Sequence, residues 1–308
     1  MDMEPSLYSI DSWQYLQEGN ENIVFSYIGS SLKYRNFVLR LPKCIPGAPS
    51  RENPAEAKAS RQKLFYELVV CPLLGKQYLQ EKISIPVGSE FLSKLNSEAL
   101  KVRPATRRHK HIDTNIQQMT LTTNLLRMSG SSGTFSVEIK PKWGFLPTWK
   151  HLPPESPKLS NCRFCMHQKL KAIEDGKVPS RFCPLLLFAS DPLKKYRAVQ
   201  QLFETPQNNL RCFLDGIETD PGTASQEVSK EFDSQDEFLL QKMLASVLAQ
   251  DGVLNRIKAL QQDFDLYDVE GIYKMLETMD KSAISEANEQ QWKELIQSYL
   301  KGLLLSGY

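Results

Sequence analysis

The stretch from residue 136 to 145 reads Ser-Val-Glu-Ile-Lys-Pro-Lys-Trp-Gly-Phe and places a charge at every second position in its middle. Because side chains alternate between the two faces of an extended strand, Glu138, Lys140 and Lys142 are expected to share one face. Two ammonium groups and a carboxylate on one face suit a cavity that holds a multiply charged anion. An edge strand with a solvated polar face explains the same pattern, and spacing alone does not decide between the two.

A cysteine-rich segment follows, in which thiols and an imidazole stand at spacings that metal sites use. Cys162, Cys165 and His167 lie close together in the sequence, and Cys183 comes further along the chain. Soft thiolates and imidazole are ligands that Zn²⁺ prefers, so these residues form a candidate zinc site. A structural zinc site needs four ligands that close a tetrahedron, and the spacing here is irregular.

The same segment also predicts a cationic helix face. Arg163, His167 and Lys171 stand at i, i+4 and i+8, which places them on one side of a helix. Such a face suits phosphate groups, because it gathers two cations and an imidazole. The zinc and phosphate interpretations compete for His167, and we favour phosphate.

Two further stretches carry groups that bind anions. Residues 101–111 form a basic run that includes Arg107. A run of this kind is typical of a solvated surface or a nucleic-acid patch, although few aromatic residues are interleaved for stacking on bases. Asn208 and Asn209 stand just before Arg211, and consecutive asparagines are also common as turn formers.

A turn-rich loop near the N-terminus is a candidate for binding nucleotide phosphates. Residues 18–22 read Glu-Gly-Asn-Glu-Asn and connect two predicted strands, and Arg40 lies on the strand that returns. The backbone N–H groups of such a loop can fold over phosphates, as the glycine-rich loop of kinases does. One glycine is a weak signal, so by itself the loop is better interpreted as an ordinary hairpin.

The composition is that of a globular protein, and its charge is unevenly distributed. The 308 residues are 41% hydrophobic and 24% charged, with a net charge of +2. Before Asp215 there are 30 basic and 18 acidic residues, whereas from Asp215 onward there are 8 and 18. This asymmetry indicates an anionic ligand for the first two-thirds, either nucleic acid or a polyphosphorylated metabolite.

The sequence also limits the cellular compartments in which the protein is expected. No window approaches the roughly 18 apolar residues that cross a bilayer, so no membrane association is expected. The acidic N-terminus, Met-Asp-Met-Glu-Pro, lacks the apolar core of a secretory signal, which predicts a protein of the cytoplasm, the nucleus or both. The six cysteines are then expected to be reduced thiols rather than a disulfide framework.

Periodicity and turn residues predict a chain of mixed helices and strands. The first fifty residues favour an antiparallel β-unit, and further strands are expected at 83–87, 118–126 and 136–139. Helices are expected at 54–70, 89–95, 192–203 and 290–305, with others between 237 and 260. The acidic stretch 215–235 is rich in Ser, Thr and Gly, and a flexible insertion is expected there.

Residues 138–147, Glu-Ile-Lys-Pro-Lys-Trp-Gly-Phe-Leu-Pro, resemble the signature of the inositol-pentakisphosphate 2-kinases. Further matches follow in the family's order: Glu-Gly-x-x-Asn at 18–22, Arg-Pro-x-x-Arg at 103–107, Arg-x-x-Met-His-Gln-x-x-Lys at 163–171 and Thr-Pro-Gln-Asn-Asn at 205–209. The resemblance implies an α+β, two-lobed inositol phosphate kinase fold. Residues 1–125 would form an N-lobe of antiparallel sheet and helices with the nucleotide loop and a hinge. Residues 126–308 would form an α/β C-lobe, incomplete at its C-terminus, with the inositol-phosphate site.

The resemblance also implies an activity and roles for residues. It implies an ATP-dependent and Mg²⁺-dependent kinase that phosphorylates inositol 1,3,4,5,6-pentakisphosphate at the 2-hydroxyl to give inositol hexakisphosphate (phytate). ATP would contact Glu18, Gly19, Asn20, Asn22, Arg40 and Asn124. The inositol phosphates would contact Arg107, Glu138, Lys140, Lys142, Arg163, His167, Lys171, Asn208, Asn209 and Arg211.

The catalytic base is not assigned within this sequence. Relatives continue well beyond the position of Tyr308, with an Asp-Cys-Ser segment that supplies the catalytic aspartate, and this sequence does not contain that segment. We therefore expect a monomer that binds the ligands with little or no turnover. Two other classes stay open: a non-catalytic inositol-polyphosphate-binding or regulatory form, and a zinc-dependent nucleic-acid module. The spread of the charges over separate segments disfavours the second.

Overall fold

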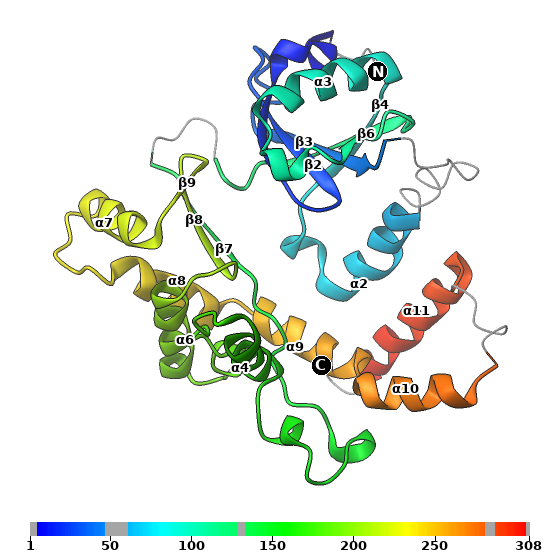
Figure 1. Cartoon of the computed structure of the whole chain (residues 1–308), viewed down its shortest axis with the longest axis vertical. Coiled ribbons are helices and arrows are strands. Elements are labelled where there is room, and N and C mark those ends of the chain that lie inside the picture. The colour runs from blue at the N-terminus through cyan, green and yellow to red at the C-terminus, as the bar shows by residue number, and fades with distance from the viewer. Residues whose placement is uncertain (1–4, 47–60, 128–132, 281–286, 306–308) are drawn as a thin grey trace. The chain divides into compact units, whose positions relative to one another are not determined.

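The computed structural model of the chain (Figure 1) describes residues 5–46, 61–127, 133–280 and 287–305. Two compact units make up the chain: residues 1–131 with 289–308, and residues 132–288. Helices and antiparallel sheets occur together, so the predicted α+β class is confirmed. Within the described ranges, none of the helices combines the length and apolar character that crossing a lipid bilayer requires.

The first unit is built on an antiparallel sheet. Its strand order is β1-β2-β3-β6-β4, and β5 pairs with the end of β3. The strands are β1 (Trp13–Glu18), β2 (Asn22–Tyr27), β3 (Phe37–Cys44), β4 (Lys82–Pro86), β5 (His111–Ile112) and β6 (Gln118–Thr123). Strands β1 and β2 form a hairpin whose connection is the loop that begins at Glu18, as the sequence predicts.

Helix α3 (Ser89–Val102) covers one face of this sheet (Figure 1). It is longer than predicted, because the apolar positions Phe91, Leu92, Leu95 and Ala99 continue the helical spacing beyond residue 95. All four are buried in one core with the inward residues of the strands. This core fixes the sheet on which the candidate nucleotide residues stand.

Two other helical segments belong to the first unit. The predicted helix at 54–70 lies in part outside the described residues; its end is a π-helical turn (Tyr66–Val70) followed by α2 (Cys71–Leu74). The last helix, α11 (Glu289–Leu305), also groups with this unit rather than with the C-lobe that the sequence predicted. The physical reason is an aromatic contact, in which the ring centroids of Phe65 and Trp292 lie 5.4 Å apart, edge to face.

The second unit combines a small sheet with helices. Its strands are β7 (Phe135–Ile139), β8 (Leu210–Leu214) and β9 (Ile217–Thr219), antiparallel, with β8 in the middle and β7 at an edge. Its α-helices are α4 (Arg163–Asp175), α5 (Pro184–Leu187), α6 (Pro192–Glu204), α7 (Pro221–Glu231), α8 (Leu239–Gln250), α9 (Val253–Phe264) and α10 (Asp268–Thr278). Helices and strands share one core around Phe182, Phe188 and Leu202. The sheet of the second unit is antiparallel.

The predicted flexible insertion at 215–235 is wrong. The stretch forms β9 and α7, and the side chain of Asp220 caps α7 by accepting a hydrogen bond from the backbone N–H of Thr223 at 3.0 Å. Ala224 and Val228, at i and i+4, are buried in the core of the second unit. An acidic residue of this stretch is therefore the cap of an amphipathic helix, and the small residues Ala224, Ser225 and Ser229 lie on its buried face.

Candidate functional site

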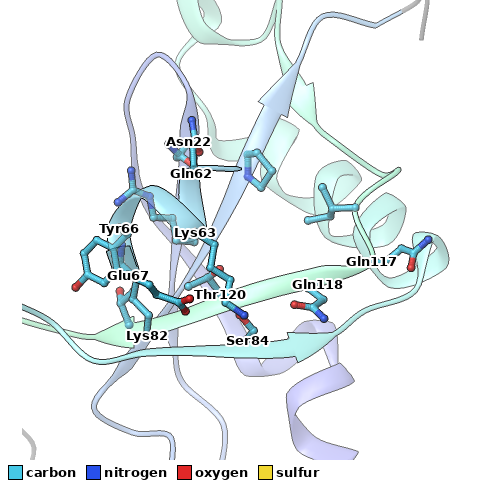
Figure 2. Close-up of a pocket in the computed structure, with 14 residues that line it drawn as sticks. Asn22, Gln62, Lys63, Tyr66, Glu67, Lys82, Ser84, Gln117, Gln118 and Thr120 are labelled. Carbon is cyan, nitrogen blue, oxygen red and sulfur yellow. The ribbon is translucent and has the colours of Figure 1, made fainter. Parts of the chain in front are cut away.

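A cavity of about 580 Å³ opens on β3, β4 and β6 of the first unit (Figure 2). Three cations line it: Arg40, Lys63 and Lys82. Burial and the charge of Arg40 lower the pKa of Lys82, so these two groups lie close enough to repel each other. A phosphate group near them would relieve this repulsion, which makes the cavity a candidate site for a phosphorylated ligand.

The remaining lining of the cavity is mostly polar. Figure 2 shows Lys63, Tyr66 and Glu67 from one helical segment beside Lys82 and Thr120 from the sheet. The sequence did not predict Lys63 or Lys82 as functional residues. The available signal was the polar alternation of Lys82 with Ser84 on β4 and of Gln118, Thr120 and Thr122 on β6, which places these side chains on one sheet face.

The side chain of Glu18 has a structural task, and its predicted contact with ATP stays a prediction. The carboxylate is 2% exposed and accepts hydrogen bonds from Arg103 Nε at 2.7 Å and Nη2 at 2.8 Å. The ammonium group of Lys43 pairs with the same carboxylate and donates to the carbonyl of Gly19 at 2.6 Å. Because both carboxylate oxygens are bonded in the protein interior, Glu18 fixes the start of the loop.

The rest of the predicted nucleotide loop is closed on itself. The backbone N–H of Gly19 donates to the carbonyl of Asn22 at 2.9 Å, so this group is already used. Lys110, from the basic run, donates to the carbonyl of Asn20 at 3.2 Å. Asn22 and Arg40 line the cavity as the prediction requires of nucleotide contacts. Asn124 lies in a local turn, where its side-chain oxygen accepts from the N–H of Leu126 at 3.0 Å.

Three lysines of the second unit form a group that we call the lysine cluster: Lys140, Lys142 and Lys171. Burial, and then the charges of Lys140 and Lys171, lower the pKa of Lys142. The three ammonium groups therefore lie within reach of one another's fields. The Nζ atom of Lys142 is also 5.7 Å from the ring centroid of Phe164, a cation–π contact. A partly buried lysine repelled by two neighbouring cations is an arrangement that a bound polyanion would stabilise.

The position of Lys142 comes from a turn rather than from strand alternation. Strand β7 ends at Ile139, and Lys142 has a φ of 61°, in the left-handed region that side chains rarely adopt. The prediction that all three charges follow one strand face is therefore wrong beyond Lys140. The side chain of Gln261 on α9 holds this turn: its Nε2 donates to the carbonyl of Lys142 at 2.9 Å, and its Oε1 accepts from the N–H of Gly144 at 2.8 Å.

Arg211 lies beside the lysine cluster but is shared by two carboxylates. It stands opposite Glu138 in the β7–β8 pair, and its Nη1 is 3.5 Å from a carboxylate oxygen of Glu138. Its Nε and Nη2 donate to Glu218 at 2.8 and 2.5 Å, and these bonds raise the pKa of Arg211. Lys140 Nζ is 3.8 Å from the other oxygen of Glu138. Glu138 therefore links Lys140 with Arg211.

Asn209 places an amide next to the lysine cluster. Its backbone carbonyl accepts a hydrogen bond from the N–H of Lys140 at 2.9 Å. Its side chain is only 1% exposed, and neither amide atom has a hydrogen-bond partner among the residues that the structure describes. A buried amide without partners is energetically costly, so this group is suited to contact a ligand or an ordered water. Asn208, the next residue of the predicted pair, is exposed.

Arg163 lies in ion pairs within the second unit, and its predicted contact with the inositol phosphates stays a prediction. Its Nη2 lies 3.0 Å from Asp265 and 3.4 Å from Asp268, and its guanidinium carbon is 5.4 Å from the ring centroid of Trp143. Two carboxylates neutralise this guanidinium, so it ties the start of α4 to the α9–α10 junction. His167 is exposed further along α4. Arg107 is exposed in the first unit, so its predicted meeting with the lysine cluster stays a prediction.

The three cysteines that the sequence singled out come together. The Sγ atoms of Cys162, Cys165 and Cys183 all lie within 4.8 Å of one another, the only group of three or more potential metal ligands in the described part of the chain. All three are free thiols. His167 is not in this group, because residues two apart on a helix point in different directions. The grouped cysteines therefore do not include His167, and its predicted contact with phosphate stays a prediction.

Comparison with known proteins agrees with the resemblance seen in the sequence. The sequence profile of the family described as inositol-pentakisphosphate 2-kinase matches residues 15–304. An inositol-pentakisphosphate 2-kinase of Danio rerio is 33% identical over an alignment of 233 positions, which covers 70% of this chain and 45% of the relative. One of Arabidopsis thaliana is 32% identical over an alignment of 308 positions, which covers 84% of this chain and 68% of the relative. One of Cryptococcus neoformans is 29% identical over 289 residues (88% and 66%).

Proposed function

The chain belongs to the inositol-pentakisphosphate 2-kinase family, and on this premise we propose that it binds ATP and inositol pentakisphosphate. The reaction proposed is transfer of the γ-phosphoryl group of ATP to the 2-hydroxyl of the inositol ring, which gives inositol hexakisphosphate and ADP. The chain spans 45% of the zebrafish relative and 68% of the Arabidopsis relative, so the reaction is proposed for the protein as a whole.

The lysine cluster is the observation that carries the proposal. Five phosphates on a small ring bear more negative charge than a neutral pocket tolerates, so cations must surround them. Lys142 lies close enough to Lys140 and to Lys171 for their charges to interact, and Asn209, whose side-chain amide is buried without a partner among the described residues, is bonded through its backbone carbonyl to the N–H of Lys140. A neutral substrate would not call for three cations whose mutual repulsion destabilises the free protein.

The cavity of the first unit supports the nucleotide part of the proposal. Its volume of about 580 Å³ falls in the range of roughly 300–1,000 Å³ that is usual for small-molecule sites. Arg40, Lys63 and Lys82 would neutralise the phosphates of ATP, and the polar strand residues would contact the rest of the nucleotide. Mg²⁺ is commonly held by one or two carboxylates together with nucleotide phosphates. Glu67 is a carboxylate in the cavity lining and would hold the ion there.

A second candidate, binding without transfer by these 308 residues, is favoured by the state of Glu138. Transfer needs a base that removes the proton of the attacking 2-hydroxyl while the γ-phosphoryl leaves ADP. Glu138 is the carboxylate beside the lysine cluster, and ion pairs with Lys140 and Arg211 occupy it. Each of its two oxygens faces a cation, so Glu138 links two side chains of the protein rather than standing free to meet the 2-hydroxyl.

Calorimetric titration of the purified chain with inositol pentakisphosphate tests the proposal. Lys142→Gln and Lys171→Gln should each weaken binding about tenfold, because each removes a charge–phosphate contact worth about 1.4 kcal/mol. Lys169→Gln is the matched control, since Lys169 is exposed on the same helix but two residues from Lys171. Equal losses in all three variants would show only a diffuse charge effect. ADP formation that depends on inositol pentakisphosphate separates the kinase from the binding protein.

A further inference from the structure

We propose that a cavity between α6, α7 and α8 binds an arginine side chain in a basic segment of a partner protein. The cavity has a volume of about 290 Å³ and lies in the second unit, where α8 packs against both α6 and α7 (Figure 1). None of the described residues that line it belongs to the phosphate or nucleotide contacts that we assign. The inference is therefore independent of the proposed function.

Carboxylates and aromatic rings set the chemistry of this cavity. Phe203 and Glu204 line it from the end of α6, and Glu237 and Phe238 line it from the residues just before α8. None of the described residues in the lining is a lysine, arginine or histidine. A cation with a flat, weakly hydrated face fits such a lining, because it pairs with carboxylates and stacks on aromatic rings. The guanidinium of arginine is a group of this kind.

The side chain of Gln241 supplies a second observation that points to a ligand. It lines the cavity from the first turn of α8, is 9% exposed, and its Oε1 has no hydrogen-bond donor among the described residues. A buried amide oxygen without a donor is energetically costly. A half-turn of the terminal amide exchanges its oxygen with its nitrogen, so the oxygen can face the side that a ligand occupies. A guanidinium carries five N–H donors, so it can bond this oxygen and a carboxylate together.

Among the described residues, Glu237 is the lining carboxylate without a cation of its own. Its side chain is exposed, whereas Glu204 pairs with Arg181 at 3.0 Å. Lys242, on the adjoining α8, is neutralised by Asp236 at 2.7 Å. Glu237 is therefore the group that an incoming guanidinium would pair with, and the exposed pair of Glu204 can reorganise around it.

Hydrogen bonds hold the rim of the cavity in place without a ligand. The hydroxyl of Ser229 donates to the carbonyl of Asp236 at 2.8 Å, and a carboxylate oxygen of Asp236 accepts from the N–H of Phe238 at 3.0 Å. These bonds fix the backbone of Glu237, which lies between the two residues, and leave the side chain of Phe238 42% exposed. A preformed site loses less conformational freedom on binding, which favours the capture of a single side chain.

The charge of the adjoining sequence identifies the partner as basic. Residues 215–241, which supply most of the lining, contain eight acidic residues and one basic residue, whereas the whole chain has a net charge of +2. Such a surface attracts a segment rich in lysine and arginine and repels nucleic acid and anionic lipid. A polyamine has the positive charge but lacks the planar guanidinium, so the occupant that we assign is a protein segment centred on arginine.

Fluorescence anisotropy with a labelled peptide tests the proposal on the full 308-residue chain. The probe is Lys-Gly-Lys-Gly-Arg-Gly-Lys-Gly-Lys, and two matched probes carry citrulline or lysine in place of the arginine. Citrulline keeps the shape of arginine without its charge, so its probe should bind about tenfold more weakly. The lysine probe should bind several-fold more weakly, because an ammonium group lacks the planar fork. Equal affinity of the arginine probe and either matched probe would overturn the assignment.

Variants of the protein separate the cavity from general charge attraction. Glu237→Gln should weaken binding of the arginine probe about tenfold. The matched control is Glu231→Gln, because Glu231 is exposed at the end of α7 and does not line the cavity, and it should leave the affinity unchanged. If the control lost as much affinity as Glu237→Gln, diffuse charge would hold the peptide and the proposal would be wrong.

Gln241→Leu tests the amide itself. The variant removes a buried polar group that has no partner among the described residues, so the melting temperature should not fall, yet the arginine probe should bind several-fold more weakly. Unchanged affinity would exclude the predicted contact with Gln241. Inositol pentakisphosphate binding, measured on the same samples, should be unaffected by these variants. Its failure in the wild type would contradict the proposed function and leave this inference standing.

Discussion

The guanidinium of Arg103 donates hydrogen bonds to both carboxylate oxygens of Glu18, from 85 residues away in the sequence. Both side chains are essentially inaccessible to solvent, with exposures of 0% and 2%. Arg103 also donates to the backbone carbonyls of Arg107 and Lys110 at 2.7 and 2.8 Å. A single guanidinium therefore joins the loop after β1 to the basic segment that carries Arg107.

Substitution of Glu18 should destabilise the first unit strongly. Glu18→Gln leaves the charges of Arg103 and Lys43 buried without a counter-charge, and breaking a buried pair in this way costs about 3–5 kcal/mol. Glu90→Gln, which removes the partner of Lys94 at an exposed i, i+4 pair, should leave the free energy of unfolding nearly unchanged. Urea unfolding of both variants measures the difference.

The pair of Glu18 and Arg103 also makes the free energy of unfolding depend on pH in the acid range. Burial alone would raise the pKa of Glu18, but the hydrogen bonds from Arg103 and Lys43 outweigh it and hold the pKa below its usual value. The stabilisation is therefore full above the ordinary glutamate pKa of about 4.3 and is lost as pH falls through the folded-state value. A Glu18→Gln variant as stable as the wild type at neutral pH would contradict both statements.

The helices and strands that carry the sequence motifs could be predicted, because the patterns that indicate them involve residues close together in the sequence. The 3.6-residue spacing of Arg163, His167 and Lys171 indicates a helix, and α4 is present. The alternation from Ser136 to Ile139 indicates a strand, and β7 is present as an edge strand. Local spacing also suggested that the three cysteines belong together, and their sulfur atoms do meet.

The partners of the charged residues could not be predicted. Arg163 is neutralised by Asp265, about a hundred positions later in the chain, and no periodicity reports such a pair. Lys63 and Lys82 meet in one cavity because separate elements fold over each other. Which cations stay free and which are used inside the protein depends on these long-range contacts. The sequence therefore predicted the charged segments better than it predicted the individual phosphate contacts.

Removal of Arg40 should weaken binding of ATP and leave inositol pentakisphosphate binding unchanged. Arg40→Gln takes one cation out of the cavity, so the ATP dissociation constant should rise about tenfold. Arg35→Gln is the control, because Arg35 is exposed in the same unit and does not belong to the cavity lining. Fluorescence titration with a labelled ATP analogue measures the nucleotide affinity of both variants. An unchanged affinity in Arg40→Gln would place the nucleotide elsewhere.

Binding of the polyanion should be coupled to protonation of Lys142. Its pKa is depressed in the free protein by burial and by Lys140 and Lys171, and bound phosphates would raise it again. Protons are then taken up on binding, so affinity should fall as pH rises from the depressed pKa toward the ordinary lysine value of about 10.4. Calorimetry in buffers of different ionisation enthalpy counts these protons.

Phosphate groups also titrate, so the comparison for this pH dependence is with Lys142→Gln, which retains the contribution of the ligand. Proton uptake at alkaline pH should be smaller in the variant than in the wild type. In Lys171→Gln the pKa of Lys142 should rise in the free protein, since one repelling charge is gone. Identical proton uptake in the wild type and in Lys142→Gln would show that Lys142 is not coupled to the ligand.

Gln261 should act as a positioning residue for the lysine cluster. Its amide makes two hydrogen bonds to the turn that contains Lys142 and Gly144, and the left-handed backbone of Lys142 depends on such support. Gln261→Ala should lower stability by about 1–3 kcal/mol and weaken polyanion binding several-fold. The adjacent Gln262→Ala is the control, because Gln262 is exposed on the same helix. Gln261→Ala leaves the number of charges unchanged. A plot of the logarithm of affinity against the logarithm of salt concentration should therefore have the same slope as for the wild type. The line for the variant should lie at weaker affinity throughout. A reduced slope would mean instead that Gln261→Ala removes an ion contact, and the positioning role would then be wrong.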